Sequence, residues 1–218
     1  MAVNKKQFIV GIDPGHQRTG NPTHEQIGPG ANRTKAKVAD GTIGRYSGLS
    51  EYELNLKVGL LLRDELETRG YLVVMTRTAN DVDISNVERV RIAEASHADI
   101  FVHIHANHSD DPAESGAMTA CMTPDNPYCA QLYTESHRLS ETILDALTAT
   151  TGARTLGIRE TDVMSGINWA SMPVTIIEMG FMSNEEEDQL MATAEYMEKL
   201  ARGIACGIEM FFDRCPEP

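Results

Sequence analysis

The segment PVTIIEMGFMSN, residues 173–184, is the part of the sequence that most clearly indicates the fold. Its apolar run has strand character and ends in a carboxylate, Glu178, which is followed by a glycine and a helix-capping asparagine. Because side chains alternate between the two faces of a strand, Glu178 is in phase with the apolar Val174 and Ile176. A charge at such a position is either paired or directed into a pocket where it takes part in chemistry.

Two other predicted strands also end in side chains that are common in catalysis. The run Phe8–Ile12 leads to His16, and the run Ile100–Ile104 leads to His105. In sheets built from strand–helix crossovers, loops converge at the carboxyl ends of the strands, so these two histidines and Glu178 are expected at one site. Two imidazoles and a carboxylate are typical constituents of a zinc hydrolase site.

Spacing alone leaves two choices open at this site. His103 lies two residues before His105 and therefore on the same face of its strand, so either could meet a metal. Ser50 and Glu53 fit a capping box at a helix start, with the Glu53 side chain folding back on the backbone. Glu51 is then free, as a metal ligand or as a first-turn carboxylate favoured by the helix dipole.

The alternation of strand and helix patterns predicts an α/β sheet in a single domain. Strands are expected near residues 7–13, 71–76, 99–105, 116–122 and 173–179. A helix should run from Ser50 to about Arg69, and a second should begin at Ser85, where Glu88 completes a capping box. Two more helices carry the apolar stripes Leu139, Ile143, Leu147 and Met197, Leu200, Ile204, Ile208, Phe211.

The composition limits the classes of protein to which this chain can belong. With 218 residues, 41% of them apolar and 23% charged, the chain is ordinary for one soluble globular domain. Its formal net charge of -13 argues against nucleic acid as a partner, because phosphate binding needs a basic face. The segment 17–48 lacks clear periodicity and carries five basic against two acidic residues, so it is expected to be a long loop that serves the site.

The cysteines and the N-terminus carry no sign of a thiolate metal site or of an export signal. Cys121, Cys129, Cys206 and Cys215 show no metal-binding spacing, and free thiols are expected, although a bridge between Cys121 and Cys129 is conceivable. No apolar segment has the length of a signal peptide or of a membrane span, so we expect an export signal to be absent or removed.

Five motifs in order along the chain give it a family resemblance. They are Asp13-Pro14-Gly15-His16, Gly48-Leu49-Ser50-Glu51 leading into Asn55-Leu56, Thr76-Arg77 with Arg89, Ala98-Asp99 to Ile104-His105-Ala106-Asn107, and Pro173 to Asn184. Together they resemble the zinc-dependent N-acetylmuramoyl-L-alanine amidases of the Amidase_3 type, which are cell-wall hydrolases. The likeness runs from Phe8 to about Phe212, and His103 stands at a position that is often Ser.

The resemblance implies a site, a fold and a substrate. It makes His16, Glu51 and His105 the ligands of one Zn²⁺ and Glu178 the catalytic carboxylate, selecting His105 over His103 and Glu51 over Glu53. It implies three layers, with a mixed, mostly parallel sheet flanked by helices, and one catalytic domain over residues 1–218 with its core at about 7–212. The substrate would be peptidoglycan, acted on outside the cell at the bacterial cell wall.

Within that resemblance, the expected reaction is hydrolysis of the amide between the lactyl group of N-acetylmuramic acid and L-alanine. Two alternatives belong to other classes: a zinc peptidase that acts within the stem peptides, and a wall-binding module without activity. Arg77 and Arg89 are expected to be structural and to pair with carboxylates such as Asp81 or Asp99.

Overall fold

The structure is a computed structural model that describes residues 7–213. Its strands are β1 (Ile9–Pro14), β2 (Asn21–Gln26), β3 (Thr34–Val38), β4 (Leu72–Met75), β5 (Ile100–Asn107), β6 (Ala117–Cys121), β7 (Thr155–Glu160) and β8 (Val174–Phe181). Its helices are α1 (Glu51–Thr68), α2 (Asn86–Ala95), α3 (Tyr133–Thr151), α4 (Ser165–Asn168), α5 (Glu185–Met191) and α6 (Ala194–Phe211), with a 3₁₀ turn at Ala130–Leu132.

Six strands form one mixed sheet in the order β4-β1-β5-β8-β6-β7. β1 pairs in parallel with β4 and β5, and β5 pairs in parallel with β8. β6 runs antiparallel to β8 and parallel to β7. The predicted mixed, mostly parallel sheet is therefore confirmed, and β1, β5 and β8 lie side by side with their carboxyl ends at one edge.

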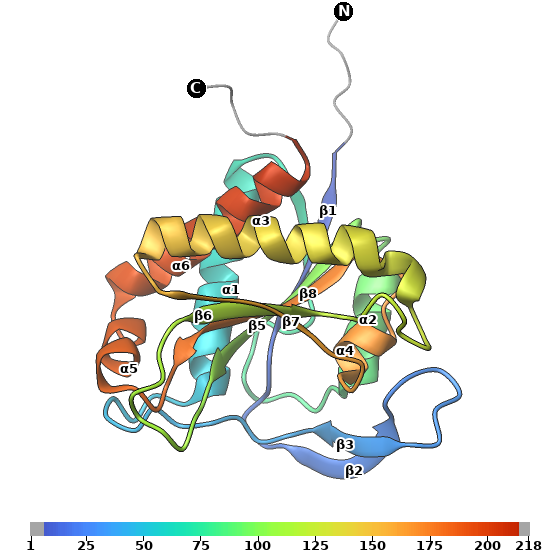
Figure 1. Cartoon of the computed structure of the whole chain (residues 1–218), viewed down its shortest axis with the longest axis horizontal. Coiled ribbons are helices and arrows are strands. Elements are labelled where there is room, and N and C mark those ends of the chain that lie inside the picture. Colours follow the sequence, from blue (N-terminus) through green and yellow to red (C-terminus); the bar gives the residue numbers. More distant parts are fainter. Residues whose placement is uncertain (1–6, 214–218) are drawn as a thin grey trace, which may run out of the picture.

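Two apolar cores, one on each face of this sheet, produce three layers (Figure 1). The larger core joins α1, α3 and α6 to the face that receives Val102 and Ile104 of β5. The smaller core lies between the opposite face and helices α2 and α4, and it contains Phe101. Because side chains alternate along a strand, His103 and His105 lie on the same face as Phe101.

The long helices are held on the sheet by their apolar stripes. α6 packs against α3 and α1 with the stripe that the sequence predicted, including Leu200, Ile204 and Ile208. The contact with α3 is close, since a Cβ at Gly207 would overlap the backbone of Ile143. Helices α1, α3 and α6 therefore pack on one face of the sheet, and the site lies on the face that α2 and α4 cover.

The segment expected to be one long loop contains a β-hairpin, which corrects that prediction. β2 and β3 form their own two-stranded antiparallel sheet, and this hairpin lies apart from the six-stranded sheet (Figure 1). Both strands are rich in polar residues, and β2 exposes most of its side chains, so neither shows the apolar alternation from which strands are predicted.

The five predicted strands and four predicted helices are present within a few residues of their expected bounds. β7, α4 and α5 were not predicted. The capping box at Ser85 forms, with Glu88 N–H donating to the Ser85 hydroxyl and Ser85 N–H donating to the Glu88 carboxylate. The capping box expected at Ser50 does not form, because the Ser50 side chain makes no cap hydrogen bond.

The cysteines of the described residues form no disulfide bond. Cys121, Cys129 and Cys206 are free, so the bridge between Cys121 and Cys129 is absent, while Cys215 lies outside the described residues. Within residues 7–213, no helix combines the length and the apolar character that crossing a bilayer requires.

Candidate metal centre and active site

His16, Glu51 and His105 meet on the α2 and α4 side of the sheet. One nitrogen of each imidazole and one oxygen of the carboxylate all lie within 4.8 Å of one another. Glu51 Oε1 is 3.1 Å from His16 Nε2 and 3.2 Å from His105 Nδ1. The two rings stand almost at right angles, with centroids 4.8 Å apart. Three donors of the kind that zinc prefers thus surround one point.

The backbone after β1 turns sharply to bring His16 into this cluster. His16 has a φ of 60°, in the left-handed region that non-glycine residues rarely occupy. Its Nδ1 lies 2.8 Å from the carbonyl oxygen of Ala39, to which it donates. Since Nδ1 carries that proton, Nε2 of the neutral ring is left with a lone pair facing Glu51.

Glu51 is the most buried member of the cluster and the first residue of α1. Its Oε2 accepts from the backbone N–H of Thr42 at 2.9 Å, which holds the other oxygen toward the two imidazoles. Burial alone would raise the pKa of Glu51, but the contacts with His105 and His16 lower that pKa well below its usual range. The carboxylate is therefore ionised at neutral pH and available as a ligand.

The two imidazoles differ in their electrostatics. Burial lowers the pKa of His105 despite its contact with Glu51. For His16, burial acts in the same direction, but the contact with Glu51 and the hydrogen bond to Ala39 outweigh it and raise the pKa. A cation placed between these groups would favour the neutral form of both rings.

Glu178 lies near the carboxyl end of β8, beside His105 of β5 in the parallel register. Its Oε2 is buried and has no hydrogen-bond partner among residues 7–213. Burial, together with the negative charge of Glu51, raises the pKa of Glu178 to about 8. A carboxylate with such a pKa can accept and release a proton near neutral pH.

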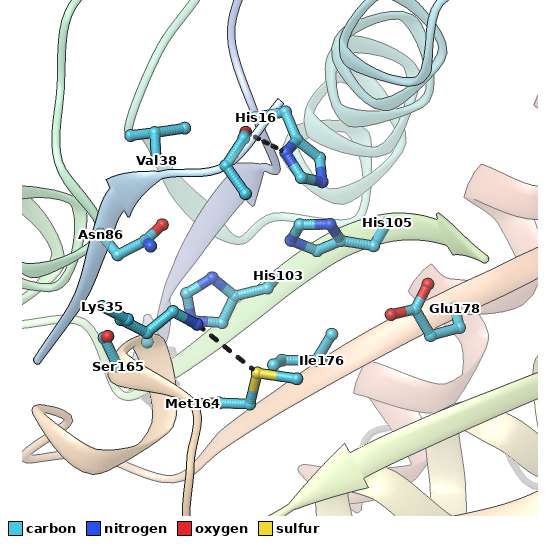
Figure 2. Close-up of a pocket in the computed structure, with 12 residues that line it drawn as sticks. His16, Lys35, Val38, Asn86, His103, His105, Met164, Ser165, Ile176 and Glu178 are labelled. Atoms are coloured by element: carbon cyan, nitrogen blue, oxygen red, sulfur yellow. Dashed lines mark hydrogen bonds between the residues drawn. The ribbon is translucent and has the colours of Figure 1, made fainter. Parts of the chain in front are cut away.

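His16, His105 and Glu178 line one pocket of about 240 Å³ (Figure 2). The other end of this pocket is formed by Lys35 of the hairpin and by Met164 and Ser165 at the start of α4. The structure thus brings together all four site residues expected from the sequence and places Glu51 directly behind the two histidines.

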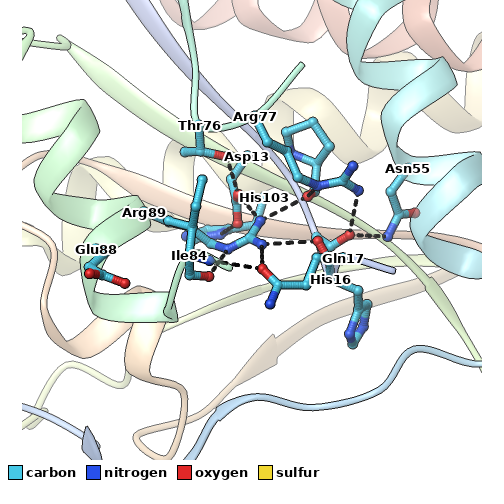
Figure 3. A network of polar contacts seen from close by, with 12 residues as sticks. Asp13, His16, Gln17, Asn55, Thr76, Arg77, Ile84, Glu88, Arg89 and His103 are labelled. Atoms are coloured by element: carbon cyan, nitrogen blue, oxygen red, sulfur yellow. Dashed lines mark hydrogen bonds and ion pairs between the residues drawn. The ribbon is translucent and has the colours of Figure 1, made fainter. Parts of the chain in front are cut away.

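A buried polar network lies next to the cluster and contacts the backbone of His16 (Figure 3). Asp13 forms an ion pair with Arg89 at 2.8 Å and accepts a hydrogen bond from His103 Nδ1 at 2.8 Å. Arg89 also donates to the carbonyl oxygen of His16 and to the side chain of Gln17, both at 3.0 Å. This network fixes the turn that carries His16.

Arg77 and Arg89 are structural, as predicted, but the predicted partners are wrong. Arg89 pairs with Asp13, while Arg77 donates to the carbonyl oxygens of Pro14, Gly15 and Tyr52. Both guanidiniums therefore satisfy the backbone of the turn after β1, where parallel strands leave carbonyl groups without partners.

Sequence reasoning missed several residues of the pocket. Lys35 sits in a polar strand that has the pattern of a solvated loop, and Ser165 belongs to a four-residue helix too short to predict. Spacing alone does not distinguish His103 from His105 as a ligand, and the structure shows His103 Nδ1 bound to Asp13. The sequence indicates His103 only through its spacing: it lies two residues from His105 and therefore on the same face of the strand.

Comparison with known proteins agrees with this architecture. Residues 10–210 match the family model Amidase_3, N-acetylmuramoyl-L-alanine amidase. The N-acetylmuramoyl-L-alanine amidase LytC of Bacillus subtilis is 33% identical over 172 residues, which are 79% of this chain and 33% of LytC. The germination-specific N-acetylmuramoyl-L-alanine amidase of the same organism is 25% identical over 224 residues, covering 96% of this chain and 82% of that protein.

Solved structures show the same fold. The crystal structure of the N-acetylmuramyl-L-alanine amidase Ami1 from Mycobacterium smegmatis superimposes with a TM-score of 0.87 at 26% identity, covering 97% of this chain and 99% of that one. The N-acetylmuramoyl-L-alanine amidase from Clostridium difficile 630 gives a TM-score of 0.76 at 27% identity and covers 96% of this chain and 99% of that one. Since the family model matches nearly all described residues and the fold is that of solved members, this chain is an enzyme of the N-acetylmuramoyl-L-alanine amidase family Amidase_3.

Proposed function

We propose that this chain is a zinc-dependent peptidoglycan amidase, with residues 1–218 as one catalytic domain and action outside the cell at the bacterial cell wall. It hydrolyses the amide bond between the lactyl group of N-acetylmuramic acid and L-alanine. The observation that carries this proposal is the convergence of His16, Glu51 and His105, together with Glu178, which lines the same pocket as the two histidines.

The donor set fits Zn²⁺. Two imidazole nitrogens and one carboxylate oxygen are ligands that catalytic zinc sites use, and three protein ligands leave a position for water or substrate. The hydrogen bond from His16 Nδ1 to Ala39 is the kind of outer contact that orients an imidazole ligand. We therefore assign one Zn²⁺ to His16, Glu51 and His105; when bound, it supplies Lewis acidity and makes water more acidic.

Glu178 is proposed to be the general base. It takes a proton from the water that attacks the amide carbonyl and then delivers this proton to the departing amine of L-alanine. Its raised pKa supports both steps, because such a group releases a proton about as readily as it accepts one near neutral pH. The pocket around it holds the reacting amide next to this carboxylate.

Digestion of purified peptidoglycan tests the bond and the metal together. Zinc-loaded protein and EDTA-treated protein are incubated with the polymer, and the soluble products are identified by mass spectrometry. Intact stem peptides with free L-alanine amino groups, released only by the zinc-loaded protein, are the expected result. Cleavage within the stem peptide, or binding of the polymer without any release, would overturn the proposal.

A further inference from the structure

One end of the active-site pocket is built for binding and takes no part in the proposed proton transfer. We call it the Lys35 recess, and it comprises Lys35, His103, Met164 and Ser165. In Figure 2 these side chains lie across the pocket from Glu178. Within residues 7–213, the recess has two buried polar atoms without a hydrogen-bond partner and one ammonium in contact with a thioether sulfur, and these three groups indicate the chemistry of a ligand.

The first group is the ammonium of Lys35. Its Nζ lies 3.9 Å from the thioether sulfur of Met164, and within residues 7–213 it is in no ion pair. Glu25, opposite Lys35 in the hairpin, directs its carboxylate to the backbone N–H of Val87. Burial lowers the pKa of Lys35 by more than the nearby charge of Glu25 raises it, so an anionic ligand would further stabilise the charged form of Lys35.

The second and third groups are the buried atoms His103 Nε2 and Ser165 Oγ, neither of which has a hydrogen-bond partner in the described part of the chain. His103 Nδ1 donates to the carboxylate of Asp13, which only accepts. This contact fixes the tautomer of a neutral ring, in which Nε2 is an acceptor, and His103 lines the pocket. The Ser165 hydroxyl both donates and accepts.

The recess thus requires a ligand with a negative charge and an N–H donor close together. In a muramoyl peptide, the sugars are neutral, and the carboxyl group of muramic acid is consumed in the scissile amide. The stem peptide, by contrast, has amide N–H groups and can have a free carboxylate next to L-alanine. Charge complementarity therefore favours the peptide side of the substrate over the glycan side.

We propose that the Lys35 recess binds the residue that follows L-alanine and selects a free α-carboxylate over a carboxamide at that residue. Lys35 pairs with the carboxylate, His103 Nε2 accepts from a peptide N–H, and the Ser165 hydroxyl bonds to a neighbouring peptide group. This assignment rests on the proposed amidase function, because it names the part of the muramoyl peptide that occupies this end of the pocket.

Two peptides that differ in one group provide the test. L-Alanyl-γ-D-glutamyl-L-lysine has a free α-carboxylate, whereas L-alanyl-γ-D-isoglutaminyl-L-lysine has a carboxamide in its place. Both have the free amino group of a reaction product, so calorimetric titration measures binding without turnover. The wild-type chain is expected to bind the acid about tenfold more tightly, the effect of one hydrogen bond to a charged group.

Three variants assign this preference to the recess. Lys35→Met should bring the two affinities within about twofold, whereas Arg33→Met removes the same charge from an exposed hairpin position outside the pocket and should keep the preference. Ser165→Ala should weaken binding of both peptides about threefold and leave their ratio unchanged, since a neutral hydrogen bond is lost.

The outcomes separate this inference from the amidase function. Equal affinity of the wild-type chain for both peptides, or a preference that survives in Lys35→Met, would overturn the role of Lys35. An unchanged affinity in Ser165→Ala would overturn the part assigned to Ser165. Neither result depends on catalysis, so failure of the peptidoglycan digestion would refute the proposed function while these titrations still decide what the recess recognises.

Discussion

Glu178 and Glu51 show how the same side chain acquires opposite properties within one site. Burial without a hydrogen-bond partner raises the pKa of Glu178 to about 8, while two imidazoles and a backbone N–H keep Glu51 ionised. A group that titrates near neutral pH suits proton transfer, and a permanent carboxylate suits metal binding. The difference arises from position, since Glu178 lies within the apolar strand β8 and Glu51 begins a helix.

Replacement of the proposed base should separate turnover from metal binding. Glu178→Gln keeps the shape of the side chain but removes its basicity, so we expect kcat to fall by about 10²- to 10⁴-fold. Zinc content, measured by atomic absorption, should stay at one equivalent. Glu186→Gln changes an exposed carboxylate of α5 and should retain full activity. Substantial activity in Glu178→Gln would remove the proposed role.

Replacement of the proposed carboxylate ligand should weaken zinc binding. Glu51→Gln removes the charge between the two histidines, so zinc affinity should fall at least about 100-fold, more than loss of a supporting contact usually costs. Glu53→Gln is the matched control, because it removes a carboxylate from the same helical turn outside the cluster. Competition titration against a chromophoric chelator measures both affinities. Equal zinc binding by the two variants would contradict the ligand assignment.

At the scale of elements, the sequence predicts the strands and helices that have a periodic apolar pattern and misses those that lack one. The strands that lead to His16 and that contain His105 and Glu178 are apolar, and the alternation of strands with helices predicts that these residues lie at one edge of the sheet. The hairpin of β2 and β3 has polar strands whose positions depend on pairing with each other, which no local pattern reveals. For that reason, the sequence indicates Lys35 only as one of five basic residues of a loop and not as a residue of the pocket.

The two predicted capping boxes show a second limit of local patterns. Both Ser50 and Ser85 are followed three residues later by Glu, yet only the box at Ser85 forms. At the start of α1, the backbone N–H of Glu51 donates instead to the carbonyl of Thr42, and Ser50 pairs with Ile43 in an isolated bridge. The partner segment is about ten residues away and is not part of the motif.

This difference predicts unequal costs for the same substitution. Ser85→Ala removes a formed cap and should lower the free energy of unfolding by about 1 kcal/mol. Ser50→Ala removes a hydroxyl that makes no cap hydrogen bond, so it should cost no more than about 0.3 kcal/mol. Urea unfolding followed by circular dichroism compares them. A larger loss in Ser50→Ala than in Ser85→Ala would show that the caps are wrongly assigned.

At the scale of the whole molecule, two buried carboxyl groups give stability opposite dependences on pH. The pKa of Asp13 is lowered by Arg89 and His103 although its burial acts in the opposite direction, so its contribution is present above its unfolded pKa of about 3.9 and is lost as pH falls further. The pKa of Glu178 is raised, so its contribution is present below about pH 4.3 and is lost as pH rises toward 8.

The metal-free protein should therefore lose stability between pH 5 and pH 8 in a way that depends on Glu178. Urea unfolding in EDTA should show a decline that is about 2–4 kcal/mol larger for the wild type than for Glu178→Gln, because a shift of one pKa unit corresponds to about 1.4 kcal/mol. His105 contributes to both proteins, whereas the charge of Glu178 raises the pKa of His16, so the difference between the two profiles includes this interaction. Parallel pH profiles of the two proteins would rule out the burial of an ionisable Glu178.

The hairpin of β2 and β3 has a consequence for how this enzyme can be altered. It forms a sheet of its own, while the residues assigned to the metal and to the base come from β1, α1, β5 and β8 or the turns beside them. Of the four residues of the Lys35 recess, Lys35 comes from this hairpin, so an exchange of the hairpin changes the charged contact of the recess and keeps the residues assigned to the metal and the base. Transplanting the hairpin of another family member onto this chain therefore tests whether the preferred target can be altered separately from the chemistry.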